Sequence, residues 1–210
     1  MKHRPAPGRN ALTVCLILYS LLAGGCSLKK AAPVKASFLL EARRADAAAP
    51  TKGTATLRVR NLQVAAPFEG RGFVYRLGDV RYESDFYHEF LASPRAMLTE
   101  QTRQWLAGSG LFQVVADSSS KVDATHGLSG NVSALFADYR EASAPKAVLA
   151  VEFFVTDNRG AEEQIMFQRS YREEIVLTDR APESLVRGWS TALGKILASL
   201  EKDLAQAALK

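Results

Sequence analysis

The sequence predicts a single α+β domain, a mainly antiparallel β-sheet packed by two main α-helices and preceded by an N-terminal targeting segment. Two patterns lead to this prediction. Apolar and polar residues alternate over three long segments between residues 128 and 177, which is typical of β-strands. Apolar residues recur at helical spacing between residues 94 and 108 and again after residue 182. The 210 residues are 47% hydrophobic and 23% charged, so the chain is of the globular class.

The first residues have the parts of a secretory signal. Lys2, Arg4 and Arg9 supply positive charge, and residues 11–23 form an apolar run of 13 residues. This run is well short of the ~20 residues that a helix needs to cross a bilayer. It leads into small residues followed by Cys26, an arrangement that resembles the lipobox of bacterial lipoproteins.

This resemblance implies cleavage before Cys26 and acylation of that cysteine, which makes residues 1–25 a lipoprotein signal peptide. Residues 26–36 would then be a lipidated tether, and residues 37–210 the folded domain. Ser27 follows the cysteine, where aspartate would resemble an inner-membrane retention signal. The resemblance therefore implies the periplasmic face of the outer membrane. The alternative is an ordinary secretory signal with an incidental cysteine.

The expected mature chain is nearly neutral. The whole sequence has 27 basic and 22 acidic residues, but residues 1–25 hold three of the bases and no acid, which leaves 24 against 22. This balance argues against a protein that binds nucleic acid or another polyanion. Cys15 lies in the segment expected to be removed, so the mature chain keeps one cysteine and forms no internal disulfide.

Short strands are expected in the first half of the domain. Residues 37–42, 57–64, 73–77 and 80–83 have strand composition, and Gly78-Asp79 between the last two predicts a tight hairpin. Residues 43–53 are rich in Ala, Pro and Gly and predict a loop.

Three longer strands are expected in the second half, at residues 128–139, 147–156 and 165–177. Turn residues at 157–160 separate the last two, so the three are predicted to form an antiparallel meander. The second strand is apolar throughout, which is consistent with burial on both faces. The first and third alternate, with these residues each expected on one side of their strand: Leu128, Val132, Ala134 and Phe136, and then Ile165, Phe167, Tyr171, Ile175 and Leu177.

Two helices are predicted from their ends and their apolar spacing. Ser93-Pro94 is an N-cap followed by a proline at the first helical position, and Gly108 closes the same element. The second helix begins near Pro182 and runs towards the C-terminus. Its apolar stripe, expected to pack in the core, contains Leu185, Trp189, Leu193, Ile196, Leu200 and Leu204.

Residues for catalysis are scarce. The sequence has no Walker loop and no Gly-x-Ser-x-Gly nucleophile motif. Asp85, His88 and Glu89 are the one local cluster with acid–base or metal-binding chemistry, but adjacent residues point apart, so a polar turn before the first helix is expected instead. His126 is expected to be solvated in a loop. The prediction is a non-enzyme with no metal site and no cofactor besides the covalent lipid on Cys26.

An ordered set of segments resembles the ABC-type transport auxiliary lipoprotein family, which includes the lipoprotein component of the paraquat-inducible operon. The set comprises Phe73 to Arg76 (FVYR), Tyr82 to Phe90 (YESDFYHEF), Ser93-Pro94, and a helix ending in Leu106 to Phe112 (LAGSGLF). With the lipobox and the long C-terminal helix, the resemblance covers about residues 38–207.

The resemblance implies a docking role in lipid traffic across the cell envelope. Such a lipoprotein would work with an inner-membrane ABC permease and ATPase and with a periplasmic protein of the mammalian-cell-entry (MCE) type. The aromatic residues suited to an exposed partner-binding patch are Tyr75, Tyr82, Phe86 and Tyr87, unless they pack under the first helix.

Two other functions stay open at this point. One is an accessory lipoprotein of envelope or peptidoglycan assembly. The other is a lipid-binding carrier or lipid hydrolase that acts alone. Homo-oligomerisation is also open, since the edge strands of an open sheet offer one route to it.

Overall fold

The computed structural model describes residues 34–44 and 53–207, and residues from Lys35 onward belong to one structural unit. The expected signal peptide (1–25) and Cys26 lie outside the described residues. So do residues 45–52 of the predicted loop. Within the described part, no helix has the length and apolar character needed to span a membrane.

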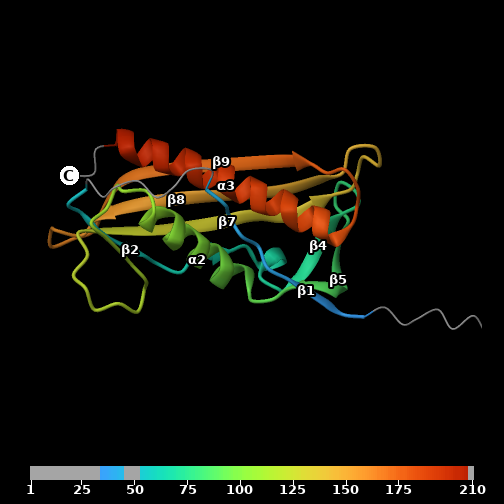
Figure 1. Ribbon diagram of the computed structural model, residues 1–210, viewed down its shortest axis with the longest axis horizontal. Coiled ribbons are helices and arrows are strands. Elements are labelled where there is room, and N and C mark those ends of the chain that lie inside the picture. The colour runs from blue at the N-terminus through green and yellow to red at the C-terminus, as the bar shows by residue number, and fades with distance from the viewer. Residues whose placement is uncertain (1–33, 45–52, 208–210) are drawn as a thin grey trace, which may run out of the picture. The chain divides into compact units, whose positions relative to one another are not determined.

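The described residues form one mixed sheet of nine strands with two helices on one face (Figure 1). The predicted α+β class is therefore confirmed. Three long strands form an antiparallel meander: β7 (His126–Asp138), β8 (Lys146–Asp157) and β9 (Gln164–Val176). The shorter strands are β1 (Ala36–Phe38), β2 (Thr56–Val59), β3 (Gln63–Val64), β4 (Gly72–Arg76), β5 (Tyr82–Phe90) and β6 (Val114–Ala116).

Parallel pairing joins the short strands to the meander. β2, β3 and β4 each pair with β7 in parallel, at successive positions along its free side. β5 then pairs with β4 antiparallel, β1 with β5 in parallel, and β6 with β2 in parallel. The strand predicted over residues 57–64 is divided into β2 and β3. Of the strand predicted over residues 37–42, only residues 37 and 38 are paired, as part of β1.

Helix α2 (Pro94–Ala107) begins and ends as predicted. The Ser93 hydroxyl accepts a hydrogen bond from the Ala96 amide at 3.3 Å, Pro94 is the first helical residue, and Gly108 is the C-cap. Helix α3 (Pro182–Gln206) buries every residue of its predicted stripe. Both helices therefore bury one side against the sheet.

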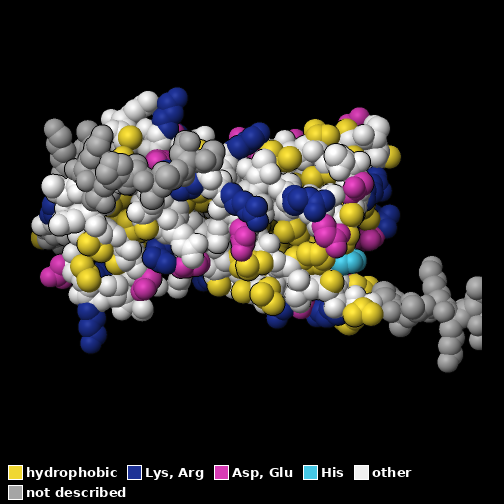
Figure 2. Space-filling model, viewed as in Figure 1, with side chains coloured by type: hydrophobic (Ala, Val, Ile, Leu, Met, Phe, Trp, Pro, Cys, Tyr) yellow, Lys and Arg dark blue, Asp and Glu magenta, His cyan; other side chains and the backbone are white. Residues whose placement is uncertain are grey.

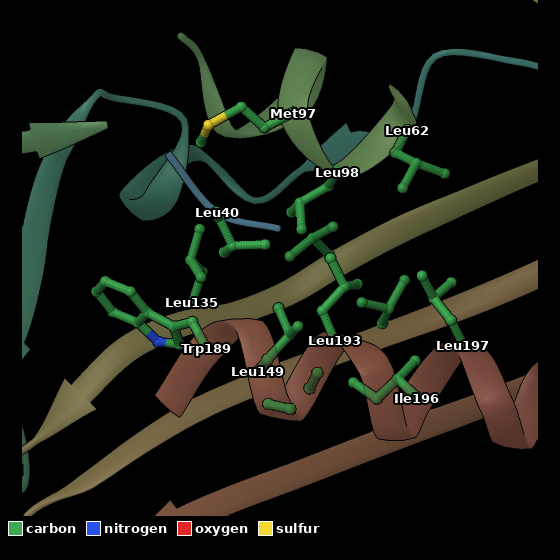
Figure 3. Packing of buried hydrophobic residues seen from close by; sticks show 14 of the residues in the cluster. Leu40, Leu62, Met97, Leu98, Leu135, Leu149, Trp189, Leu193, Ile196 and Leu197 are labelled. Atoms are coloured by element: carbon green, nitrogen blue, oxygen red, sulfur yellow. The ribbon is translucent and has the colours of Figure 1, made fainter. Parts of the chain in front are cut away.

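Figure 3 shows the core between these layers, where Leu98 of α2 and Leu193 of α3 gather with Leu135 and Leu149 from the sheet. Trp189 of α3 is the largest fully buried side chain. Its indole N–H donates to the carbonyls of Val148 (3.2 Å) and Phe136 (3.4 Å), so this buried polar group is satisfied.

A bulge in β7 changes the predicted pattern of that strand. Val132 pairs with Val151 and Ala134 pairs with Ala150, which leaves Ser133 as an extra residue. The bulge reverses the alternation, so the prediction that Ala134 and Phe136 share a face with Leu128 and Val132 is wrong. Phe136 instead stacks on Phe68 of the 3₁₀ turn Ala66–Phe68, at 5.8 Å between ring centroids.

Two more expectations need correction. The β4–β5 connection is a loop over residues 77–81 rather than the predicted two-residue turn. The Leu77 N–H donates to the Arg81 carbonyl across this loop, and Val80 within it is 95% exposed instead of lying in a strand. Ile165 is 63% exposed because the register of β9 shifts between its pairings with Val155 and Thr156.

Gly188 allows the closest contact between α3 and the sheet. A Cβ atom at this position would lie 2.7 Å from the Cβ of Ala147 and 2.6 Å from Leu177 Cδ2. Gly194, further along the same helix, has only the Arg43 carbonyl oxygen nearby, at 3.7 Å. Substitution of Gly188 therefore tests the close packing of α3 on the sheet, whereas substitution of Gly194 tests only the helix propensity of the residue.

We expect Gly188→Ala to destabilise the protein and Gly194→Ala to stabilise it. The first change forces α3 away from β8 and should lower the free energy of unfolding by about 1–3 kcal/mol. The second should raise it by roughly 0.5–1 kcal/mol, because alanine favours helix and no contact is violated. Urea denaturation of both variants measures this difference, and equal effects would contradict the packing described.

Candidate functional site

The four predicted patch residues all lie on the β4–β5 hairpin, but in three settings. Tyr75 is half-buried and stacks on Tyr139, with ring centroids 5.3 Å apart. Tyr82 packs edge-on against Phe136 at 5.6 Å between ring centroids and is 42% exposed, but it contacts none of the other three. Phe86 and Tyr87 contact each other. The structure therefore brings together only this last pair as an exposed aromatic site.

The Phe86–Tyr87 pair is presented to solvent at the β1–β5 edge. Phe86 is 73% exposed, and its ring meets that of Tyr87 edge-on at 5.3 Å. The Lys35 ammonium lies 5.6 Å from the Phe86 centroid, an approach typical of a cation–π contact. Hydrophobic side chains gather near an exposed histidine in this region of the surface (Figure 2). A large exposed aromatic group beside a cation is suited to binding another macromolecule.

Asp85 fixes the backbone beneath this pair. Its Oδ1 atom accepts hydrogen bonds from the amides of Tyr87 (2.7 Å) and His88 (3.1 Å). Its Oδ2 atom accepts the Tyr75 hydroxyl at 2.5 Å and contacts His88 Nδ1 at 2.7 Å. Residues 85–88 of β5 all lie opposite the single residue Phe73 of β4, so the strand bulges here and turns Phe86 outward.

The electrostatics of this cluster favour a charged Asp85. Burial alone would raise the pKa of Asp85, but the hydrogen bonds from Tyr75, His88 and the two amides outweigh it and lower the pKa. Burial and the hydrogen bond to Asp85 together raise the pKa of Tyr75. Asp85 is thus a carboxylate at neutral pH, and Tyr75 is its neutral donor.

The Asp85, His88 and Glu89 segment is part of β5, so the expected polar turn is wrong. Glu89 faces away from the other two and binds Lys35 (2.7 Å) and Arg71 (2.6 Å). Among the described residues, no group of three or more His, Cys, Asp or Glu side chains is placed to hold a metal ion. What was missed in the sequence is that one aspartate can accept hydrogen bonds from the backbone amides of a bulge and so keep this polar segment within a strand.

We expect Asp85→Ala to release the bulge and lower the free energy of unfolding by about 1–3 kcal/mol at pH 7, because several donors lose their acceptor. Since the pKa of Asp85 is lowered on folding, its contribution is present at neutral pH and is lost as pH falls through the lowered value. Thermal unfolding should therefore separate the variant from wild type at pH 7 and less so in acid. Glu83→Ala, on the exposed part of the same strand, is the control.

His126 is fully buried at the start of β7, so the expected solvated loop histidine is also wrong. Its Nδ1 atom lies 2.9 Å from the Thr125 hydroxyl, which bonds the backbone of Thr56, and its Nε2 atom has no partner. Burial, helped by the charge of Arg159 and opposed by Asp157, lowers the pKa of His126. The parallel pairing of β2 with β7 encloses this ring, which no local pattern indicated.

This burial makes stability depend on pH. The folded state resists protonation of His126, while the unfolded state takes up the proton near the ordinary histidine pKa, about 6.5. Stability should therefore fall as pH drops from about 7 towards 5. Urea titrations at pH 7 and pH 5 measure this loss of stability. The loss should disappear in His126→Asn and remain in His88→Asn. Equal pH dependence in wild type and His126→Asn would contradict this account.

A second surface feature lies along α3. Residues 39–44, the end of α2 and α3 border a groove of about 910 Å³. Arg44 at its edge forms a bidentate ion pair with Glu201 (2.8 and 2.9 Å). Glu201 also accepts a hydrogen bond from the indole N–H of Trp105 at 2.7 Å. Its basic side chains are Arg43, Arg44, Arg187, Lys195 and Lys202, against the acidic Glu41 and Glu201. The groove combines an apolar lining with net positive charge.

Comparisons with known proteins agree on the fold. No family model matches the sequence, and no curated protein matches it. Protein XCC0632 from Xanthomonas campestris, described as belonging to DUF330, is similar in structure with a TM-score of 0.70 at 14% identity, over 81% of this chain and 95% of that one.

A crystal structure described only as an uncharacterized protein is similar with a TM-score of 0.65 at 15% identity, over 81% of this chain and 99% of that one. Lipoprotein GNA1162 from Neisseria meningitidis also matches, but its TM-score of 0.31 is too low to support an argument. At these identities the comparisons establish that the chain shares the α+β fold of the DUF330 protein.

Proposed function

We propose that this protein is a lipid-anchored, non-catalytic docking component of an ABC transport system for lipids. Cys26 carries the anchor, which holds the domain on the periplasmic face of the outer membrane. Its partners are a periplasmic MCE-type protein and the inner-membrane ABC permease and ATPase. The support from the sequence is the lipobox and the ordered segments that resemble the ABC-type transport auxiliary lipoprotein family.

The observation that carries the proposal is the exposed Phe86–Tyr87 pair. These residues lie within the segment YESDFYHEF, one of those on which the resemblance rests. Asp85 holds them on a bulged strand, so little conformational freedom is lost when a partner covers them. Rigid, exposed aromatic side chains are typical centres of protein interfaces. We therefore assign the partner contact to this pair, with Tyr75 as a support and Tyr82 as a packing residue.

A membrane anchor close to this pair is consistent with docking. β1 begins at Ala36 and pairs with His88 to Phe90, so the chain enters the domain beside Phe86 and Tyr87. Eight residues lie between Cys26 and Lys35, so the nine steps from one to the other permit at most about 30 Å between the anchor and the domain. The pair would thus meet a partner near the membrane surface.

The test is capture of the full-length lipidated protein from mildly crosslinked envelopes, with proteins and lipids identified by mass spectrometry. Wild type should recover the MCE-type protein and its permease. Phe86→Ala with Tyr87→Ala should reduce that recovery roughly tenfold or more, because truncation of central interface aromatics costs 2 kcal/mol or more. Val122→Ala is the control: it shortens an exposed side chain in the segment before β7 and should leave the recovery unchanged.

A second function, a lipid carrier acting alone, is favoured by the groove along α3. An apolar lining with basic side chains suits an anionic lipid. In the same capture experiment, lipid recovered without a protein partner would support the carrier and overturn the docking role. Recovery of cell-wall synthases would instead support an accessory protein of peptidoglycan assembly.

A further inference from the structure

β9 is a long edge strand. It pairs with β8 from Gln164 to Val176, and in the described part of the chain no strand pairs with its other side (Figure 1). Every second residue of an edge strand points its amide and carbonyl groups outward, ready to pair with another strand. At thirteen residues this edge is as long as β7, the longest strand at the centre of the sheet.

The side chains of β9 are complementary to those of a second, antiparallel copy of β9. A two-fold axis through Tyr171 and perpendicular to the sheet places Arg169 opposite Glu173 and Phe167 opposite Ile175. Each of these pairs occurs twice, once on each side of the axis. Side chains directly opposite on antiparallel strands lie close enough to interact, and opposite charges there are favourable.

Neighbouring registers lack this match. An axis at Ser170 would place Phe167 opposite Glu173, and an axis at Arg172 would place Arg169 opposite Ile175. An axis between residues would set side chains of opposite faces against each other, since alternate residues point to opposite faces. An axis at Glu173 would pair Arg172 with Glu174, but it would also place the two Glu173 carboxylates opposite each other, which is unfavourable. Of these registers, the one centred on Tyr171 pairs opposite charges and apolar side chains without opposing like charges.

The charged groups of this register remain accessible within one copy. The Arg169 side chain is 55% exposed although it binds Asp203 at 2.8 Å, and the Glu173 side chain is 32% exposed at 3.7 Å from Lys195. A guanidinium carries five N–H donors and a carboxylate has several acceptor sites, so each can keep its partner on α3 and still pair across the edge. Charges on an edge strand usually prevent pairing, but here the self-pairing register sets opposite charges together.

We propose that two copies of this chain associate through β9, as an antiparallel β9–β9 pair centred on Tyr171. The two sheets then form one continuous sheet, and α3 of both copies lies on the same face. The contact uses neither Phe86 nor Tyr87, so it does not depend on the docking function.

Reversal of the two charges tests the contact. The full-length lipidated protein, purified in detergent, is examined by sedimentation velocity over a range of concentrations. Wild type should form a dimer. Arg169→Glu alone and Glu173→Arg alone should each weaken association by about tenfold, because each places two like-charged pairs across the axis. The double variant, with both charges exchanged, should restore it.

Arg172→Glu is the matched control. It also reverses an exposed charge on β9, but residue 172 lies opposite the uncharged Ser170 of the second copy, so this variant should leave association unchanged. Circular dichroism confirms that each variant is folded. A wild-type monomer at all concentrations would overturn the proposal. So would a dimer insensitive to both single reversals, a double variant that stays dissociated, or a control as defective as the single variants.

Discussion

The packing of α3 against the β7–β8–β9 meander is the contact on which the other elements depend. Trp189 fills the centre of this layer and also satisfies its own N–H on strand carbonyls, so the helix has one position along the sheet. Gly188 permits the backbone approach that brings the indole there. α2 and β2 to β4 then assemble on the other side of β7, where their apolar residues extend the same core.

Irregular positions in two strands decide where aromatic side chains of the sheet lie. In β7 the extra residue Ser133 sends Phe136 to the face where it meets Phe68 and Tyr82. In β5 a larger bulge, held by Asp85, turns Phe86 outward. A regular strand would alternate its residues between core and solvent. The bulge in β7 instead buries Phe136 against Phe68, whereas the bulge in β5 leaves Phe86 exposed.

The two proposed contacts lie at different edges of one sheet. Phe86 and Tyr87 are at the β1–β5 edge, close to where the chain enters from the expected anchor, while β9 is the edge on the other side of the meander. A pair of copies joined through β9 would therefore present two Phe86–Tyr87 sites. Two sites facing a partner that is itself an oligomer bind more tightly than one, because the second contact forms within the complex.

The sequence by itself determined the features that depend on local chemistry. The cap at Ser93, the proline at residue 182 and the three long strands were predicted because caps, turns and periodicity are set by near neighbours in the chain. Tertiary structure alone decided the parallel pairing of β2 to β4 with β7, the burial of His126 and the role of Asp85. The strand pairing and the burial of His126 depend on residues tens of positions apart, such as Thr56 with Thr125, whose meeting no periodicity encodes. The role of Asp85 depends on a bulge that forms only when β5 pairs with β4. The free energy that decides them comes from burial in the assembled core, which exists only when all the layers are in place.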